Sequence, residues 1–462
     1  MSEVVLAYDR PSRLDGGVLG LGRAGDSGPL PFFDGFAARP GLVAALLLAV
    51  AAVARSRYFQ PSAARLLDPI LTSGDGRLRL ESFSSCCGVY ARADLLPEAL
   101  TGTRAAPGTT NVDLNQDVRD ALSQLDDRDE LRLSVGADGL TVVTRATAAF
   151  ERKVTLPTRW IKGLGEAALA QAGMQVAATA GPAATRRLLT GLPPAGPASA
   201  PPWALVAQGR ELRFRQAATA RAPLVAGPFR LREMRPLARY ALGLTVWTRP
   251  GPGPRSTAFQ LDLPGARLWL VLSPDVTRGF SGEGQALGVL ADPGTVAAAS
   301  ALRPALAWTS RLDETALAAS AGVTTGRLRQ MLAVLGSQGL VGYDLAEQAW
   351  FRRDLPFAAG RVPTLQPRVR RAAAISAPDI TVQPIEGGHE VFVRGRGFAH
   401  RVALAGGDAC CTCLWFSRHG DSRGPCRHVL AARAHVAATS SEASAQPPAA
   451  PAGRPNYQET GS

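Results

Sequence analysis

The sequence predicts an α+β protein of several domains, and three observations support this fold class. At 462 residues the chain is long enough for about two to four domains. Hydrophobic residues make up 46% of it and charged residues 19%, as in globular proteins. A Pro-, Ala-, Gly- and Ser-rich stretch at 193–202 is a candidate linker, and cysteine and histidine gather near the C-terminus.

Residues 1–192 are expected to form an N-terminal α/β region. Its clearest feature is the apolar run from Leu42 to Ala54, which lies in a helix expected over 42–58. The run is too short to span a bilayer and is flanked by Arg39 and Arg55, so it predicts a buried core helix and no membrane association. The other elements expected here are strands over 77–83, 130–135 and 140–144 and helices over 116–125, 160–178 and 183–189.

Residues 203–292 carry repeated strand patterns and are expected to form a separate antiparallel β domain. The strands are expected over 212–215, 244–248 and 268–272. The run Pro250-Gly251-Pro252-Gly253-Pro254 can only be a turn or loop.

Residues 297–356 are predicted to form two short helices and a hairpin. Asp313 caps the first helix, and Thr324 or Thr325 caps a second one over 326–335. This segment resembles bacterial winged helix-turn-helix modules, whose second helix enters the major groove of DNA. That helix exposes Arg327 and Arg329, but nearby acidic residues repel phosphate. A DNA reader, a protein-docking module and a purely structural module therefore remain open for this segment.

The C-terminal cysteines and histidines follow a metal-binding pattern. Cys411 and Cys413, then Cys426 and His428, offer three thiolates and one imidazole, the closed tetrahedral shell of a structural Zn²⁺ site. Cys411 and Cys413 could reach one metal ion from the same face of a strand, and Cys426 and His428 from the first turn of a helix. We expect a small ββα module over 375–438, followed by a disordered tail over 439–462 that is poor in large apolar residues.

Two alternatives to this ligand set stay open. Cys410 and Cys413 form the commoner C-x-x-C knuckle, and His419 would be available to complete that shell. The cysteines could also be free thiols beside a surface histidine.

The spacing Cys-x-Cys followed by Cys-x-His resembles the SWIM zinc finger, a small ββα module, and the text around it is similar to the bacterial branch of that family. Upstream phrases at 32–36, 81–90 and 108–113 are also similar to full-length bacterial members. The resemblance implies zinc binding and contact with DNA or protein. For a protein partner, it implies a MoxR-type AAA+ ATPase acting with a von Willebrand A protein.

The net charge of +13 favours a polyanionic partner such as nucleic acid. Lys153 and Lys162 are the only lysines, so an arginine-rich composition alone could account for this charge. The distribution is more informative, because eleven arginines and five acids between 361 and 438 place +6 in this part of the chain. Arg418, Arg423 and Arg427 would form a basic rim around the zinc site and are, with Arg327 and Arg329, the candidate nucleic-acid contacts.

Nothing in the sequence favours catalysis. A full zinc shell leaves no open position for water, and no small-molecule site is evident. Cys86 and Cys87 could supply a thiol nucleophile, but every histidine lies about 300 or more residues away along the chain. The start of the chain lacks the pattern of a signal peptide, and the cysteines suit a reducing cytoplasm, where we expect the protein to reside.

Overall fold

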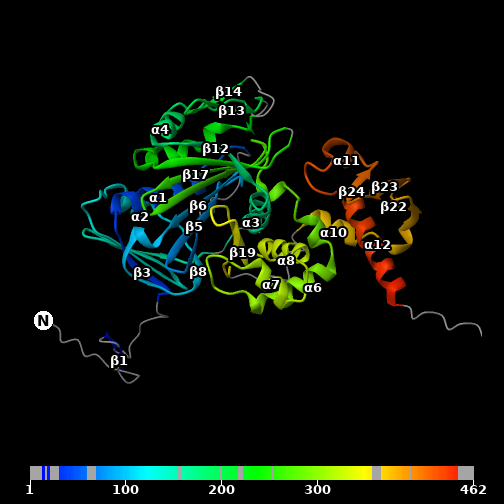
Figure 1. Cartoon of the computed structure of the whole chain (residues 1–462), viewed down its shortest axis with the longest axis horizontal. Coiled ribbons are helices and arrows are strands. Elements are labelled where there is room, and N and C mark those ends of the chain that lie inside the picture. Colours follow the sequence, from blue (N-terminus) through cyan, green and yellow to red (C-terminus); the bar gives the residue numbers. More distant parts are fainter. Residues whose placement is uncertain are drawn as a thin grey trace, which may run out of the picture. The chain divides into compact units, whose positions relative to one another are not determined.

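The computed structural model describes residues 13–15, 18–20, 31–59, 69–154, 156, 158–197, 200–216, 222–251, 253–355, 366–395 and 397–445 (Figure 1). The chain folds into two compact units. The first consists of residues 1–283 and 297–359, and the second of residues 284–296 and 360–462.

An eight-stranded antiparallel sheet is the centre of the first unit, in the order β12-β16-β17-β18-β6-β5-β4-β8. Its strands, in chain order, are β4 (Ile70–Gly74), β5 (Arg77–Phe83), β6 (Val89–Leu95), β8 (Gly108–Asn111), β12 (Gln175–Ala180), β16 (Gly243–Thr248), β17 (Thr257–Leu263) and β18 (Ala266–Leu272). β6 pairs along its whole length with β18, so the stretch 193–202 does not separate two domains. The ranges 1–192 and 203–292, expected to be separate, share one sheet.

Helix α1 (Pro40–Arg55) covers one face of this sheet at β5 and β6. Proline stands in its first turn, where the missing N–H is not needed. Leu78 and Leu80 of β5 join α1 in one hydrophobic core, and Ser82 Oγ donates to the Val50 carbonyl of the helix at 3.1 Å. The apolar run is therefore a buried core helix, as predicted. No helix in the described part of the chain combines the length and the apolarity that a membrane crossing needs.

Helix α3 (Thr158–Gln171) and the hairpin of β19 (Val341–Asp344) and β20 (Ala349–Arg352) contribute to the opposite face of the sheet. Phe83 of β5 packs on Trp160 of α3, with ring centroids 5.8 Å apart. The helix expected over 160–178 is shorter than predicted, because Gly173 follows α3 and the chain then enters β12.

Six fully buried charged residues fill the contact between the sheet and the hairpin. They are three guanidinium groups and three carboxylates, from Arg79, Glu81, Arg92, Asp94, Asp344 and Arg353. Arg92 binds Asp94 at 2.9 Å and Asp344 at 2.8 Å, while Arg79 binds Asp344 at 3.0 Å. Arg353 pairs with Glu81, which also accepts a hydrogen bond from Tyr90 at 2.6 Å. The network balances its own charge within the interior.

The rest of the first unit forms smaller sheets and connecting helices. One five-stranded sheet has the order β11-β10-β9-β3-β7, and a three-stranded sheet has the order β14-β13-β15. The elements not yet bounded are β1 (Arg13–Asp15), β2 (Val18–Gly20), β3 (Phe33–Ala37), η1 (Pro97–Ala99), β7 (Leu100–Ala105), α2 (Gln116–Ser123), β9 (Leu131–Gly136), β10 (Gly139–Thr144), β11 (Ala148–Arg152), α4 (Pro182–Thr190), β13 (Trp203–Gln208), β14 (Glu211–Arg215), β15 (Leu224–Val225), η2 (Pro228–Tyr240) and η3 (Phe280–Gly282).

The segment 297–356 contains the two helices and the hairpin expected there, but it belongs to the first unit. Helix α7 (Glu314–Ser320) is capped by Asp313, and α8 (Thr325–Ser337) is capped by the hydroxyl of Thr324. The second half of α8, from Met331 to Ser337, is buried and packs on α3. Only the first half of α8 keeps an exposed side, so the winged-helix resemblance stays a prediction.

The second unit is built on a four-stranded antiparallel meander of β21 (Ile380–Ile385), β22 (Gly388–Arg394), β23 (Ala399–Ala405) and β24 (Asp408–Cys411). Helix α12 (Arg427–Ala445) contacts all four strands, and Val391, Val393 and Val402 form the core with it. The expected ββα module is thus larger than predicted, and α12 continues past the start of the tail expected at 439. The rest of that tail, from 446 onward, lies outside the described residues.

Short helices of the two units remain to be bounded. They are α5 (Leu287–Leu290), α6 (Pro293–Leu302), which runs across the division between the units, η4 (Arg303–Ala305), α10 (Pro367–Ala373), η6 (Ala377–Asp379) and α11 (Leu414–His419). α10 packs against α12.

Candidate metal centre

The four predicted ligands come together in the second unit. The ligand atoms of Cys411, Cys413, Cys426 and His428 all lie within 4.8 Å of one another, and the four side chains are buried. Three sulfur atoms and one imidazole nitrogen at this spacing suit a tetrahedral zinc ion. The prediction of one structural Zn²⁺ site is confirmed.

The elements that carry the ligands differ in part from the expected ones. Cys411 is the last residue of β24, but Cys413 lies beyond the strand and is the N-cap of α11. Cys413 Sγ accepts the N–H of Phe416 at 3.4 Å, and Cys426 Sγ accepts the N–H of Val429 at 3.4 Å. Each of these sulfurs therefore faces the N–H groups at the start of a helix, which favours the thiolate that zinc requires.

The thiols of the cluster share hydrogen bonds when no metal is bound. The hydrogen bond from Cys411 lowers the pKa of the Cys426 thiol to about 4, and the same contact raises the pKa of Cys411 well above its usual range. Burial raises the pKa of Cys413. The raised pKa values of Cys411 and Cys413 mean that these thiols must lose their protons when they bind zinc.

The ring of His428 is held between the cluster and the surface. Its Nδ1 lies 3.8 Å from Cys411 Sγ, while Arg427 Nε donates to its Nε2 at 3.1 Å. His400 stacks on this ring with the centroids 4.0 Å apart. A metal ion on Nδ1 would leave the ring proton on Nε2, so the Arg427 contact would have to open and the guanidinium would turn toward solvent.

The rival shell does not form. Cys410 is exposed and pairs with Ala403 in the sheet, whereas Cys411 pairs with the buried Val402. Because neighbouring strand residues point to opposite faces, only Cys411 faces the core. The ring of His419 lies against Trp415, 5.0 Å away, and not in the cluster.

Arg368, a residue that the sequence did not single out, supports the segment 411–428 that carries the four ligands, here called the zinc loop. Its Nη1 donates to the carbonyls of Arg423 at 2.5 Å and Pro425 at 3.3 Å, and its guanidinium lies 4.8 Å from the centre of the Trp415 ring. Gly424 has φ +68 and touches Gly284, so a Cβ at this position would clash. No spacing rule connects Arg368 to a loop 55 residues later.

The candidate arginines belong to both units. In the second unit, Arg418 and Arg427 are exposed and Arg423 is half-buried. In the first unit, Arg327 donates to Gln330 at 3.1 Å, and Arg329 forms an ion pair with Glu314 at 2.7 Å. Arg329 and Glu314 also line a pocket of about 310 Å³, so part of the exposed side of α8 is already engaged.

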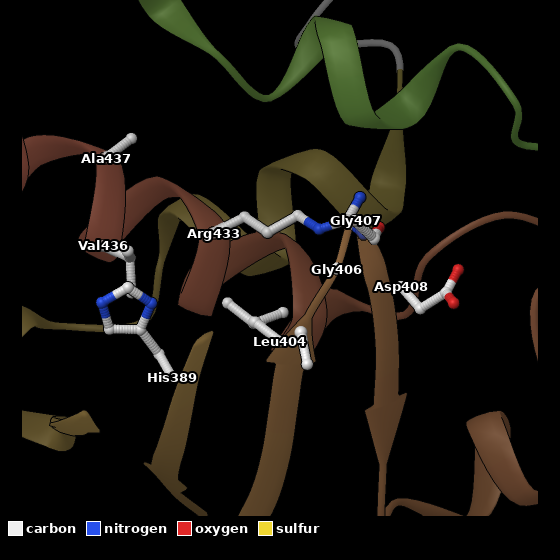
Figure 2. Close-up of a pocket in the computed structure, with 9 residues that line it drawn as sticks. His389, Leu404, Gly406, Gly407, Asp408, Arg433, Val436 and Ala437 are labelled. Carbon is white, nitrogen blue, oxygen red and sulfur yellow. The ribbon is translucent and has the colours of Figure 1, made fainter. Parts of the chain in front are cut away.

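A shallow pocket of about 260 Å³ lies between the sheet and α12, at the turn that joins β23 to β24 (Figure 2). Figure 2 shows Arg433 extending from α12 toward Gly407, whose carbonyl its Nη2 reaches at 3.0 Å. His389 pairs with Leu404 near the end of β23, while His400 by the metal cluster lies near its start. The pocket and the metal centre are therefore at opposite ends of the sheet.

The adjacent cysteines of the first unit are buried. Burial raises the pKa of Cys87 to about 12, which makes its thiol a poor nucleophile. Cys86 Sγ lies 3.5 Å from the Tyr58 N–H and 3.5 Å from Ser84 Oγ. The described surroundings fit a packed pair of thiols.

The comparisons agree with the class of site that the geometry defines, a small zinc-binding module. Residues 400–433 match the SWIM zinc finger family, and this range contains all four ligands. The chain therefore contains a SWIM zinc finger, as predicted. No curated relative matches the sequence.

Three solved structures align loosely with about half of the chain. Proliferating cellular nuclear antigen (PCNA) from Entamoeba histolytica is 10% identical, with 53% of this chain and 99% of that chain covered and a TM-score of 0.35. A chain of the PCNA2–PCNA3 complex from Sulfolobus tokodaii is 8% identical, with coverage of 53% and 99% and a TM-score of 0.37. A. fulgidus PCNA with the C-terminal region of FEN-1 is 12% identical, with coverage of 52% and 97% and a TM-score of 0.34.

Proposed function

We propose that the zinc module binds nucleic acid through the basic rim formed by Arg418, Arg423 and Arg427. The observation that carries this proposal is the position of these arginines on the segment that supplies the metal ligands. Arg427 adjoins His428, and Arg418 lies on α11, whose N-cap is Cys413. Zinc has a structural role here, because four protein ligands leave no open position for water or substrate. The role proposed for this module is therefore binding.

The charge of the centre fits this role. Three thiolates around one Zn²⁺ have a formal charge of −1, which the rim arginines more than balance. Within the described residues of the zinc loop itself, Asp421 is the one acidic side chain. The first unit should contribute less, because Arg329 is paired with Glu314 and the second half of α8 is buried.

The test is a titration of the full-length protein with duplex DNA, single-stranded DNA and RNA at low salt. Changing Arg418, Arg423 and Arg427 to Glu should weaken binding to every sequence. It should also flatten the slope of log affinity against log salt by up to about three units, since each phosphate contact contributes about −0.9 for duplex DNA. A charge-matched control changes Arg370, Arg371 and Arg433 to Glu, which are exposed residues of the same unit outside the zinc loop.

Equal losses in the two triple variants would show that only net charge matters and would remove the rim from the proposal. A wild-type protein that shifts none of the three nucleic acids at low salt would end it. Zinc content should be measured in every variant, because Arg427 contacts a ligand.

A second candidate function, a protein-interaction adaptor, is favoured by one observation. Leu414, next to the ligand Cys413, is 65% exposed, and an exposed large apolar side chain on a rigid module is a common protein contact. The resemblance to bacterial SWIM proteins suggests a MoxR-type AAA+ ATPase and a von Willebrand A protein as partners. A pull-down with and without nuclease separates the two functions. A partner that survives nuclease and is lost in Leu414→Ala supports the adaptor.

A further inference from the structure

The turn between β22 and β23 presents a phenylalanine to solvent. Phe398 is 65% exposed, although it follows a sheet whose other large apolar residues mostly face α12. The turn is closed by the Gly395 N–H, which donates to the Phe398 carbonyl at 2.8 Å, and Gly397 has φ +89. Arg394 pairs with Ala399 at the base of the turn.

Ring contacts connect Phe398 to the metal centre. The Phe398 and His400 rings meet edge to face, with centroids 4.9 Å apart, and His400 stacks on the zinc ligand His428 at 4.0 Å. Arg427 precedes His428 in the chain, and its Nε donates to Nε2 of the His428 ring at 3.1 Å. An exposed aromatic ring and an exposed guanidinium therefore lie beside the same zinc ligand, and zinc on His428 Nδ1 would leave that guanidinium turned toward solvent.

We propose that this surface, formed by Phe398, His400 and Arg427, binds single-stranded nucleic acid, with one base stacked on Phe398 and the adjoining phosphate on Arg427. The inference rests on the proposed nucleic-acid function and specifies the form of nucleic acid. Proteins that bind single strands combine aromatic rings, on which bases stack, with cationic side chains that follow the backbone. In a duplex the bases already stack on one another, so an exposed ring in a turn gains little from it.

The other exposed apolar side chains of this unit do not offer the same chemistry. Among its described residues, Leu414 is 65% and Ile385 is 43% exposed, and both are aliphatic. Phe398 is the one aromatic among these three. A nucleic-acid base can stack on the ring of Phe398 but not on an aliphatic side chain. A partner that needs only an apolar contact would use Leu414 equally well. This difference supplies a matched control, because Phe398 and Leu414 have the same exposed fraction.

The experiment measures the affinity of full-length, zinc-loaded protein for a homopolymeric single-stranded DNA, the same length of RNA, and a duplex. Phe398→Ala should weaken single-strand binding by about 5- to 150-fold per stacked base, while Phe398→Trp should preserve it. The salt slope should stay unchanged in Phe398→Ala, because no charge is removed, and should flatten by about 0.7 in Arg427→Glu. Leu414→Ala should bind as the wild type does.

Each outcome decides something different. If duplex binds as tightly as single strands and Phe398→Ala changes neither, the stacking inference is overturned but the basic rim stands. If Leu414→Ala loses as much affinity for single strands as Phe398→Ala does, the exposed side chains make only general apolar contacts and the inference is also wrong. Absence of all nucleic-acid binding would remove the proposed function itself. The DNA and RNA arms show which kind of single strand the surface prefers.

Discussion

The two units bury charged groups in opposite ways. In the first unit, three guanidinium groups and three carboxylates balance one another between the eight-stranded sheet and the β19–β20 hairpin, and these six residues are 0–3% exposed. In the second unit, three cysteines and a histidine come together in a small core, and none of its described arginines is buried beside them. The first network balances its charge within the chain, whereas the second is a site for a metal ion.

This difference indicates which unit depends on zinc supply and on pH. Burial alone would raise the pKa of Glu81, but Arg353 holds it below its usual range. Arg92 and Arg79 likewise overcome the burial of Asp344 and hold its pKa well below the usual range. In the metal centre, zinc takes the part that arginine has in the first unit. The thiols must lose their protons to bind it, so the fold of the second unit depends on zinc supply and on pH.

Zinc removal should have the largest effect, and it should act on one unit only. Structural zinc contributes about 10–16 kcal/mol to the folding of small zinc-finger peptides. Chelation should therefore unfold the region 375–438 and leave the eight-stranded sheet intact. Limited proteolysis with mass spectrometry should show new cuts first in that region. Simultaneous cutting across residues 31–355 would mean that the sheet also depends on zinc.

Mild acid should release zinc from the second unit before it destabilises the first unit. Cys411 and Cys413, whose pKa values are raised, must lose their protons when zinc binds, so the apparent affinity for zinc should fall as the pH falls. The ion pairs of Asp344 in the first unit should persist to lower pH, because the pKa of this carboxyl is lowered. Its contribution to stability is present above about pH 4, the unfolded value, and disappears only as pH falls through the folded value. Zinc release followed with a chromogenic chelator at pH 5–7 should precede any loss of near-ultraviolet circular dichroism from the buried tryptophans.

Single ligand changes should weaken the metal centre selectively. Cys411→Ala or His428→Ala should abolish stoichiometric zinc, because three ligands no longer close the shell. Cys410→Ala is the matched control, since this exposed cysteine is the sequence neighbour of a ligand and points away from the cluster. Zinc content per chain, measured by mass spectrometry of purified protein, checks both. Loss of zinc from Cys410→Ala with retention in Cys411→Ala would reverse the assignment.

The contrast also explains how far the sequence could be interpreted. The ligand spacing is local, since all four ligands lie within 411–428, so the centre could be predicted from the residues alone. The stretch Arg77-Leu78-Arg79-Leu80-Glu81 alternates as an exposed strand should, yet Arg79 and Glu81 are buried. Their partners, Asp344 and Arg353, are 265 and 272 residues away, and no local pattern announces such pairs.

The same reason accounts for the error in the domain boundaries. The stretch 193–202 has the composition of a linker, but composition does not reveal that β6 and β18, on either side of it, pair along their length. Strands buried on both faces lose the polar alternation that marks them in a sequence. The helix predicted over 160–178 runs into β12, because alanine residues of this strand, such as Ala177 and Ala178, suit a helix equally well.

The smallest of these effects should come from breaking the ionic network at one point. Asp344→Ala leaves Arg79 and Arg92 short of a carboxylate in the interior, which is expected to destabilise the first unit by about 3–5 kcal/mol. Asp408→Ala, which removes an exposed carboxylate in the second unit, should change stability by less than about 0.5 kcal/mol. Urea unfolding followed by tryptophan fluorescence measures the first unit through Trp269, which donates to Asp94 within the network, and the second unit through Trp415. Zinc content should remain about one per chain in Asp344→Ala. A variant that loses zinc along with its urea resistance would show that the two units are not independent, and the comparison between them would fail.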